Sequence, residues 1–138
     1  MIVMVMDGQG GGIGATLIKG LRNGIDREME ILALGTNSIA TSRMMKAGAN
    51  KGATGERAIV LTSAKADVII GPLAIVVPDA MMGELTPSMA SAVSASEAKK
   101  ILIPLTQENI KLVGVSGEPL PHLVDQVVEI IKEMDNHV

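Results

Sequence analysis

The first fourteen residues constrain the fold of this chain more than any other stretch. Residues 1–6 are apolar without interruption, and five of the next eight residues are glycine. Apolar side chains then return at Ile13, Leu17 and Leu21, a spacing that places them on one face of a helix. A buried strand, a tight loop and a helix N-terminus are predicted in that order. Because the amides that open a helix attract anions, the loop is predicted to hold a phosphate; the alternative is a structural turn.

Composition restricts the class of protein. The chain has 138 residues, of which 47% are hydrophobic and 20% charged, and its formal net charge is -3. This balance indicates one folded domain, residues 1–138, and argues against disorder and against electrostatic capture of nucleic acid. The longest nearly apolar run, residues 68–77, is too short to cross a bilayer, and no signal-peptide pattern precedes it. We therefore expect a cytoplasmic protein with no nucleic-acid and no membrane partner.

Several residue types are missing or scarce. There is no cysteine and there are two histidines, so no disulfide and no metal site built from thiolates or imidazoles is expected. There is also no Phe, Tyr or Trp, so ten methionines and the aliphatic residues must fill the core, and no ring can stack on a base. The methionines and the positive mean hydropathy of +0.37 favour a homodimer that buries further apolar surface.

The rest of the chain alternates between predicted strands and helices. Side chains that cap helices mark two helix starts: Asn37 or Ser38 at one, and Thr86 followed by Pro87 at the other. The predicted segments are a strand at 31–34, a helix from 38 to about 47, a loop at 48–56, a strand or helical piece at 59–61, a buried strand at 67–72, a candidate strand at 74–77, a helix at about 87–98, strands at 101–105 and 110–115, and a last helix from near 119 or 121.

Two glycine patterns overlap in the first loop. Residues 10–15 fit the dinucleotide-binding pattern GxGxxA, and residues 8–14 fit GxxxGIG, which resembles the opening of the short-chain dehydrogenases. The strand that ends at residue 71 is similar to the one that lines the cofactor cleft in those enzymes. The resemblance covers about the first half of the chain. It implies a Rossmann-like fold that binds a nucleotide or dinucleotide, NAD(P) first.

Three departures from that family restrict the activity. There is no tyrosine, so the tyrosine–lysine catalytic pair of the short-chain dehydrogenases cannot be present. Asp7 stands where a small hydroxyl residue often stands. The second strand ends in residues 35–37 without an acid for a ribose 2′-hydroxyl; Asn37, Ser38 or Arg43 are substitutes, and Arg43 suits a 2′-phosphate. A complete short-chain dehydrogenase is therefore excluded.

Over its full length the chain resembles a small prokaryotic family described only as a domain of unknown function. The matching stretches are residues 7–14, 33–37, 48–56, 83–87 and 118–122. The family has no established activity, so this resemblance implies an α/β fold and no reaction.

These observations together predict the fold class. Strands that alternate with helices indicate a helix–sheet–helix sandwich. The four residues between the strands at 101–105 and 110–115 are too few for a crossover helix, so these two strands are expected to pair antiparallel. The predicted fold is α/β, a Rossmann-like three-layer sandwich with a mostly parallel sheet of about five or six strands and an antiparallel pair near the C-terminus.

The candidate site lies beyond the carboxyl ends of the strands, where ligands of open α/β sheets bind. Asp7 is one catalytic candidate, and His122 is another because the first turn of the last helix favours its neutral form and Asp125 would orient it. Asp79 and Glu84 are the nearest candidates for a carboxylate pair or a metal site. The predicted cofactor-binding residues are Gly8, Gln9, Gly10, Gly11, Gly12, Ile13, Gly14, Thr36, Asn37, Gly71 and Pro72.

Three functions stay open at this point. The first is binding of a nucleotide or dinucleotide, a small phosphate-bearing ligand, at the glycine loop. The second is a non-catalytic oligomeric or regulatory module in which the loop is structural. The third is a phosphate-ester enzyme that uses Asp7 with a divalent metal.

Overall fold

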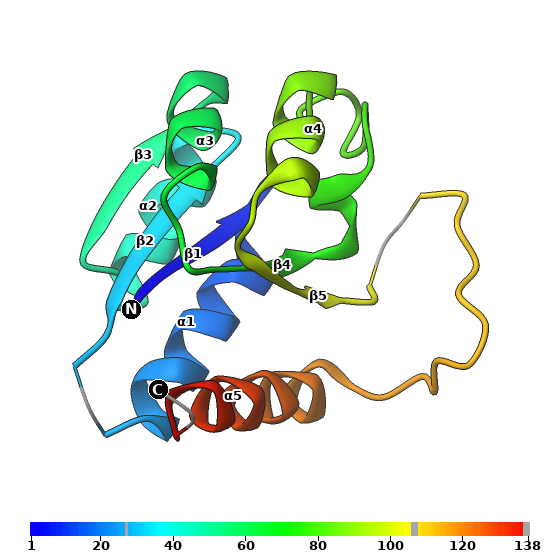
Figure 1. The fold of residues 1–138 in the computed structure, drawn as a ribbon. Helices are drawn as coiled ribbons and strands as arrows, with labels where there is room; N and C mark the ends of the chain where they lie inside the picture. The colour runs from blue at the N-terminus through cyan, green and yellow to red at the C-terminus, as the bar shows by residue number, and fades with distance from the viewer. Residues whose placement is uncertain (27, 106–107, 137–138) are drawn as a thin grey trace.

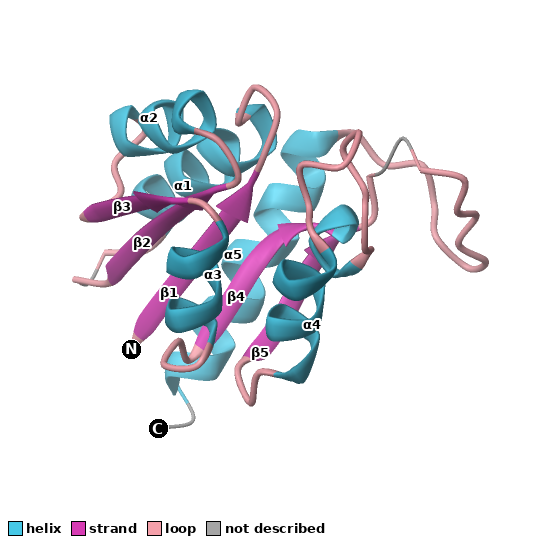
Figure 2. Cartoon of the chain, turned by 90° about the horizontal axis from the view of Figure 1, so that it is seen from above, coloured by secondary structure: helices cyan, strands magenta, loops and turns pink. Residues whose placement is uncertain are grey.

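A parallel β-sheet forms the centre of the protein. The computed structural model describes residues 1–26, 28–105 and 108–136. In these residues the sheet has five strands in the order β3-β2-β1-β4-β5, and every neighbouring pair is parallel (Figures 1 and 2). The elements are β1 (Ile2–Asp7), α1 (Gly12–Gly24), β2 (Glu30–Gly35), α2 (Ser38–Lys46), β3 (Lys51–Thr54), α3 (Glu56–Ser63), β4 (Val68–Pro72), the 3-10 helix η1 (Leu73–Val76), α4 (Pro87–Ala95), β5 (Lys99–Ile103) and α5 (Leu120–Asn136).

Helices cover both faces of the sheet, which gives three layers (Figure 2). Successive side chains of a strand point to opposite faces, so Val3 and Val5 join the core under α1, α2 and α5, whereas Met4 and Met6 join the core under α3, α4 and η1. All four side chains are fully buried. This explains why β1 is apolar at every position: a central parallel strand has no solvent face. The α/β three-layer prediction is confirmed.

The first half of the chain follows the predicted order of elements. The apolar run at the N-terminus is β1, the glycine cluster leads into α1, and Asn37 caps α2 by accepting a hydrogen bond from the Ala40 N–H at 2.8 Å. Thr86 caps α4 in the same way, with its hydroxyl accepting from the Met89 N–H at 3.2 Å. Local sequence signals were sufficient for these elements because β1 and α1 carry clear apolar patterns and because α2 and α4 each begin at a capping side chain.

The loop prediction for residues 48–56 is wrong over part of its length. Residues Lys51–Thr54 form β3, which pairs with β2 although all four side chains are exposed. Asn50 starts this pairing, because its N–H donates to the Ile31 carbonyl at 2.8 Å while its side-chain oxygen accepts from the Ile31 N–H at 2.7 Å. The backbone of the neighbouring strand, rather than an apolar pattern, makes this segment extended.

The antiparallel pair near the C-terminus is absent from the described part of the chain. β5 pairs parallel with β4, and residues 110–115 form no strand. The apolar side chains of this segment find no core, since Val113 is 98% exposed, and Gly114 turns the backbone at a φ of +86°. Alternation alone does not make a strand when no partner lies alongside. The link of four residues that supported this prediction falls partly on residues 106–107, outside the described residues.

Three smaller differences concern element type and boundaries. Residues 59–61, ambiguous in sequence, belong to α3, and the candidate strand at 74–77 is replaced by η1, which begins directly after Pro72 ends β4. α4 ends at Ala95, before the predicted 98. No helix among the described residues combines the length and apolar character that a membrane span requires.

Candidate functional site

A cavity of about 260 Å³ lies at the carboxyl edge of the sheet, between the ends of β1 and β4. The chain leaves β1 for β2 on one side, and β4 lies on the other, so this is the point where the strand order reverses. Ligands of open α/β sheets bind at such switch points because the loops diverge there and leave a crevice. The lining residues are Asp7, Gln9, Ile13, Pro72, Ala74, Met81, Leu105 and Glu108.

Asp7 is the polar group at the centre of the glycine loop. It is the last residue of β1, and its side chain is 4% exposed. One carboxyl oxygen accepts a hydrogen bond from the Gly8 N–H at 2.8 Å, and the other accepts from the Gly14 N–H, in the first turn of α1, also at 2.8 Å. The protein's own carboxylate therefore occupies amides that the sequence analysis assigned to a ligand phosphate.

The pKa of Asp7 is raised above its ordinary value of 3.8. Burial is the largest cause, because a buried carboxylate loses its hydration. Hydrogen bonds from the loop amides, that of Gly14 first, and the positive charge of Arg43 oppose this shift without cancelling it. Asp7 is thus held by backbone donors in a site that still disfavours its charge.

A second internal carboxylate connects the glycine loop to the end of β2. One oxygen of Glu84 accepts three hydrogen bonds: from the Thr36 hydroxyl at 2.7 Å, the Asn37 side-chain amide at 2.8 Å and the Gln9 N–H at 2.9 Å. We call this arrangement of Gln9, Thr36, Asn37 and Glu84 the Glu84 bridge. The Asn37 amide also donates to the Gln9 carbonyl at 2.9 Å, so the loop and the β2–α2 turn are joined directly as well.

The pKa of Glu84 is lowered from its ordinary value of 4.5. Burial by itself would raise this pKa, but the bonds from Thr36, Gln9 and Asn37 together outweigh burial because they favour the charged form. Glu84 is therefore ionised at neutral pH. It places a negative charge beside the glycine loop.

Close packing accounts for several glycines of the loop. A Cβ at Gly8 would lie 2.4 Å from the Thr36 hydroxyl, and one at Gly14 would lie 2.5 Å from the Met44 sulfur. Gly11 has a φ of +73°, and a Cβ there would lie 2.8 Å from the Ala40 Cα. By contrast, a Cβ at Gly10 would meet nothing nearer than Arg43, at 3.9 Å. Three of the glycines are thus required by the fold whether or not a ligand binds.

Arg43 brings positive charge to the outer side of the loop. It projects from α2, and its guanidinium donates to the Gly10 carbonyl at 3.3 Å. The same group lies 3.5 Å from the position that a Cβ on Gly12 would take. A phosphate above residues 10–12 would therefore meet Arg43.

The structure separates the predicted site residues into groups. Asp7, Gln9, Ile13 and Pro72 line the crevice, whereas Thr36 and Asn37 belong to the Glu84 bridge. The remaining predicted residues are the other glycines of the loop, described above, and one glycine of β4. That residue, Gly71, is buried in the sheet, where a Cβ would lie 2.4 Å from the Met6 carbonyl oxygen.

The other candidate residues do not join the crevice. His122 and Asp125 are exposed on α5, and neither lines the cavity. Asp79 and Glu84 were predicted as a carboxylate pair, but Glu84 contacts the glycine loop and the end of β2. No group of three or more potential metal ligands occurs among the residues that the structure describes.

Sequence reasoning missed the contribution of two distant segments to the site. Met81, Leu105 and Glu108 line the crevice, and the carboxylate of Glu108 accepts from the Met81 N–H at 2.9 Å. The one signal available was position: these residues follow β4 or β5 at their carboxyl ends, where ligand-binding loops gather. The contacts of Glu84 span 47 to 75 residues of sequence, and no local pattern indicated them.

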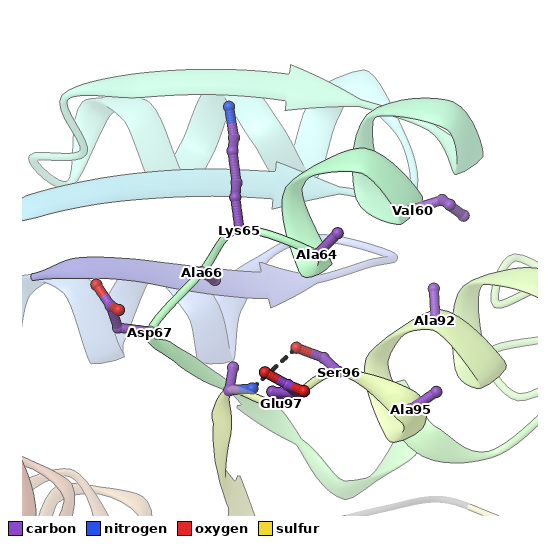
Figure 3. Close-up of a pocket in the computed structure, with 10 residues that line it drawn as sticks. Val60, Ala64, Lys65, Ala66, Asp67, Ala92, Ala95, Ser96 and Glu97 are labelled. Carbon is purple, nitrogen blue, oxygen red and sulfur yellow. Dashed lines mark hydrogen bonds between the residues drawn. The ribbon is translucent and has the colours of Figure 1, made fainter.

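A larger, shallower hollow of about 630 Å³ lies at the opposite edge of the sheet (Figure 3). It is lined by the C-terminal ends of α3 and α4 and the turns that follow them. The side chains of Lys65, Asp67 and Glu97 point in different directions and share no common focus (Figure 3). This hollow is larger than the crevice, but the crevice has both the position and the converging polar groups expected of a ligand site.

Comparison with known protein families identifies the family of this chain. The family model "Domain of unknown function (DUF3842)" matches residues 2–136. The chain belongs to this family. A search of curated proteins and a search of solved structures both gave no match. The family description names no function, so only the chemistry of the candidate site bears on function.

Proposed function

We propose that this protein binds a nucleotide, with a dinucleotide such as NAD(P) as the first candidate, across the glycine loop and into the crevice between β1 and β4. The observation that carries this proposal is the position of the crevice. A cavity at the switch point of a parallel sheet, next to a glycine loop that opens a helix, is the usual nucleotide site of such folds.

The internal carboxylates restrict how the ligand is held. Asp7 accepts hydrogen bonds from the N–H groups of Gly8 and Gly14, so a phosphate bound to those N–H groups would have to displace a buried carboxylate. The side of the loop at residues 10–12 suits a phosphate better, because Arg43 lies against it. Arginine binds phosphate oxygens with paired donors and keeps its charge at every physiological pH.

The chemistry of the crevice suits the uncharged end of such a ligand. Glu108 lines the crevice with a carboxylate, which favours groups that donate hydrogen bonds, such as amides, amino groups and hydroxyls, whereas both oxygens of Asp7 already accept backbone hydrogen bonds. Ile13, Pro72 and Leu105 provide apolar walls. A base would lie between aliphatic side chains here, since the chain has no aromatic residue.

A specific observation also favours a second candidate, a non-catalytic module with a structural glycine loop. Gly8, Gly11 and Gly14 are explained by packing and by backbone conformation, and two carboxylates of the chain satisfy the loop donors. Binding data separate the two candidates. The metal-assisted enzyme is less favoured, because both carboxyl oxygens of Asp7 already accept backbone hydrogen bonds.

A homodimer also remains a proposal. Three apolar side chains are largely exposed, Ile39 by 71%, Met82 by 98% and Val113 by 98%, and a partner subunit that covered them would bury that surface. Light scattering at several protein concentrations measures the mass. A mass of one chain at all concentrations would contradict the proposal.

Calorimetric titration with NAD, NADP and ATP tests the proposed function. A matched pair of variants locates the site: Leu105 lines the crevice and is 37% exposed, and Leu112 lies outside it and is 38% exposed. Leu105→Glu adds a carboxylate to the crevice and should weaken binding at least about tenfold, or about 1.4 kcal/mol. Leu112→Glu should bind as the wild type does. If wild type binds none of the three ligands at millimolar concentration, the proposal is wrong.

A further inference from the structure

The end of β2 receives a carboxylate from a distant part of the chain. No acid follows β2 in the sequence, but the Glu84 bridge places that side chain on the two residues directly after this strand, Thr36 and Asn37. From this placement we infer that Glu84 is the residue that binds the ribose hydroxyls of the nucleotide and selects ligands with a free 2′-hydroxyl. The inference rests on the proposed function and names the ligand class of the same site.

The position of Glu84 is the one that this role requires. In dinucleotide-binding sheets an acid at the end of the second strand accepts a hydrogen bond from the ribose 2′-hydroxyl, because the nucleoside lies between that strand and the glycine loop. Glu84 contacts both places: the Gln9 N–H in the loop at 2.9 Å and the Thr36 hydroxyl after β2 at 2.7 Å. The carboxylate is supplied from the loop between β4 and α4 instead of from β2 itself.

The carboxylate of Glu84 has the capacity to accept further hydrogen bonds. A carboxylate offers about four lone-pair positions on its two oxygens. The three hydrogen bonds of the Glu84 bridge all fall on Oε1, and the side chain is half-buried rather than enclosed. The three donors fix the orientation of the group, while Oε2 remains the oxygen that suits a ribose hydroxyl.

The segment that carries Glu84 is held in an unusual backbone conformation. Asp79, Met81 and Met82 have φ angles of 66°, 58° and 57°, and none of them is glycine. Such conformations cost free energy and persist only where other contacts hold them. The hydrogen bond from the Asp79 N–H to the Leu85 carbonyl at 2.7 Å closes this turn and aims Glu84 at the end of β2. The same turn buries Met81 and Leu85 in the core under α3 and α4, and it presents Glu84 to the end of β2.

Selectivity follows from the charge of Glu84. An ionised carboxylate accepts from a 2′-hydroxyl and repels a 2′-phosphate. Arg43, which the sequence analysis assigned to a 2′-phosphate, instead donates to the Gly10 carbonyl on the loop. The ligand class is therefore a nucleotide with an unsubstituted ribose, such as NAD or ADP, in preference to NADP.

A chemical double-mutant cycle tests this inference by calorimetry. The ligands are ADP and 2′-deoxy-ADP, with NAD and NADP as a second pair, and the proteins are wild type, Glu84→Gln, Glu84→Asp and the control Glu97→Gln. Glu97 is an exposed carboxylate at the opposite edge of the sheet. Loss of the 2′-hydroxyl should weaken binding to wild type and Glu97→Gln about tenfold, and NADP should bind them at least about tenfold more weakly than NAD.

The Glu84 variants should lose this discrimination. Glu84→Gln keeps an oxygen for the three donors but replaces the second oxygen with an NH₂ group. Glu84→Asp keeps the negative charge, but its side chain is one methylene group shorter, so the charge lies farther from the ribose. Both should bind ADP and 2′-deoxy-ADP within about twofold of each other, with circular dichroism checking that each is folded. Equal or tighter NAD binding by Glu84→Gln would overturn the inference, because Glu84 would then brace or block the site. If wild type binds no nucleotide at all, the proposed function itself fails, which is a different result.

Discussion

Replacement of Gly8 by alanine tests whether the Glu84 bridge forms as described. The added Cβ would lie 2.4 Å from the Thr36 hydroxyl, 2.6 Å from the Met81 sulfur and 3.2 Å from a Glu84 carboxyl oxygen. The methionine end can move aside, but the hydroxyl cannot move without losing its bond to Glu84. Gly8→Ala must therefore break the hydrogen bond between Thr36 and Glu84.

The expected cost can be worked from these contacts. Overpacking of a close contact costs about 1–3 kcal/mol, and each hydrogen bond that is lost removes about 0.5–1.5 kcal/mol. With the hydroxyl bond lost and the methionine displaced, we expect the free energy of unfolding to fall by about 2–3 kcal/mol. For a dependence on urea of about 2 kcal/mol per molar, the unfolding midpoint falls by about 1–1.5 M.

Urea unfolding followed by far-ultraviolet circular dichroism is the appropriate assay, because the chain has no aromatic residue for fluorescence. Gly10→Ala is the matched control. Its Cβ would lie 3.9 Å from Arg43 and meet nothing nearer, so we expect a change within about 0.5 kcal/mol. If the two variants are equally stable, the Glu84 bridge does not form in solution.

Three further predictions concern Asp7, the α4 cap and the core. Burial raises the pKa of Asp7 above 3.8, so the contribution of the Asp7 carboxyl group to stability is fully present below pH 3.8 and is lost as pH rises through the raised pKa. The difference in unfolding free energy between wild type and Asp7→Asn should therefore fall from acid to neutral pH. A difference that does not depend on pH would contradict this. Thr86→Ala removes the cap of α4 and should cost about 0.5–2 kcal/mol in urea unfolding, whereas a neutral result would show that the cap is dispensable. Leu17→Ala, at a fully buried position under the sheet, should cost about 2–5 kcal/mol and lower the thermal midpoint; a loss below about 1 kcal/mol would place this side chain outside the core.

The part of the fold predicted from sequence is the part that local signals specify. The strand, loop and helix at the N-terminus combine a continuous apolar run, a glycine cluster and a helical apolar period, and all three agree. The caps at Asn37 and Thr86 are equally local, since each side chain bonds an amide three residues on. Where several such signals coincide, the local sequence is enough to specify the type and position of the element.

The missed elements depend on contacts between distant segments. β3 is extended because its backbone pairs with the edge of β2, although the four exposed residues of β3 show no apolar pattern. Residues 110–115 show the opposite: a pattern that alternates but meets no partner strand. In both cases pairing, rather than composition, decides whether a strand forms.

The sequence indicated where a crevice would lie better than it indicated the contacts inside it. The crevice lies at the predicted carboxyl edge beside the glycine loop, and Asp7, Gln9, Ile13 and Pro72 line it, while ligand binding there stays a prediction. The sequence could not show that Asp7 folds back onto the amides of Gly8 and Gly14. Nor could it show that a glutamate about 48 residues beyond Thr36 would supply the acid that the end of β2 lacks.

The central claim, that a nucleotide binds at the crevice, is tested most directly by methyl NMR of the methionines. Met81 lines the crevice, and Met29 is buried at the far edge of the sheet, before β2. Titration of NAD into protein with labelled methionine methyl groups should shift the Met81 signal in a saturable way and leave the Met29 signal unchanged. An unmoved Met81 signal at millimolar NAD, or equal shifts at Met81 and Met29, would contradict the claim.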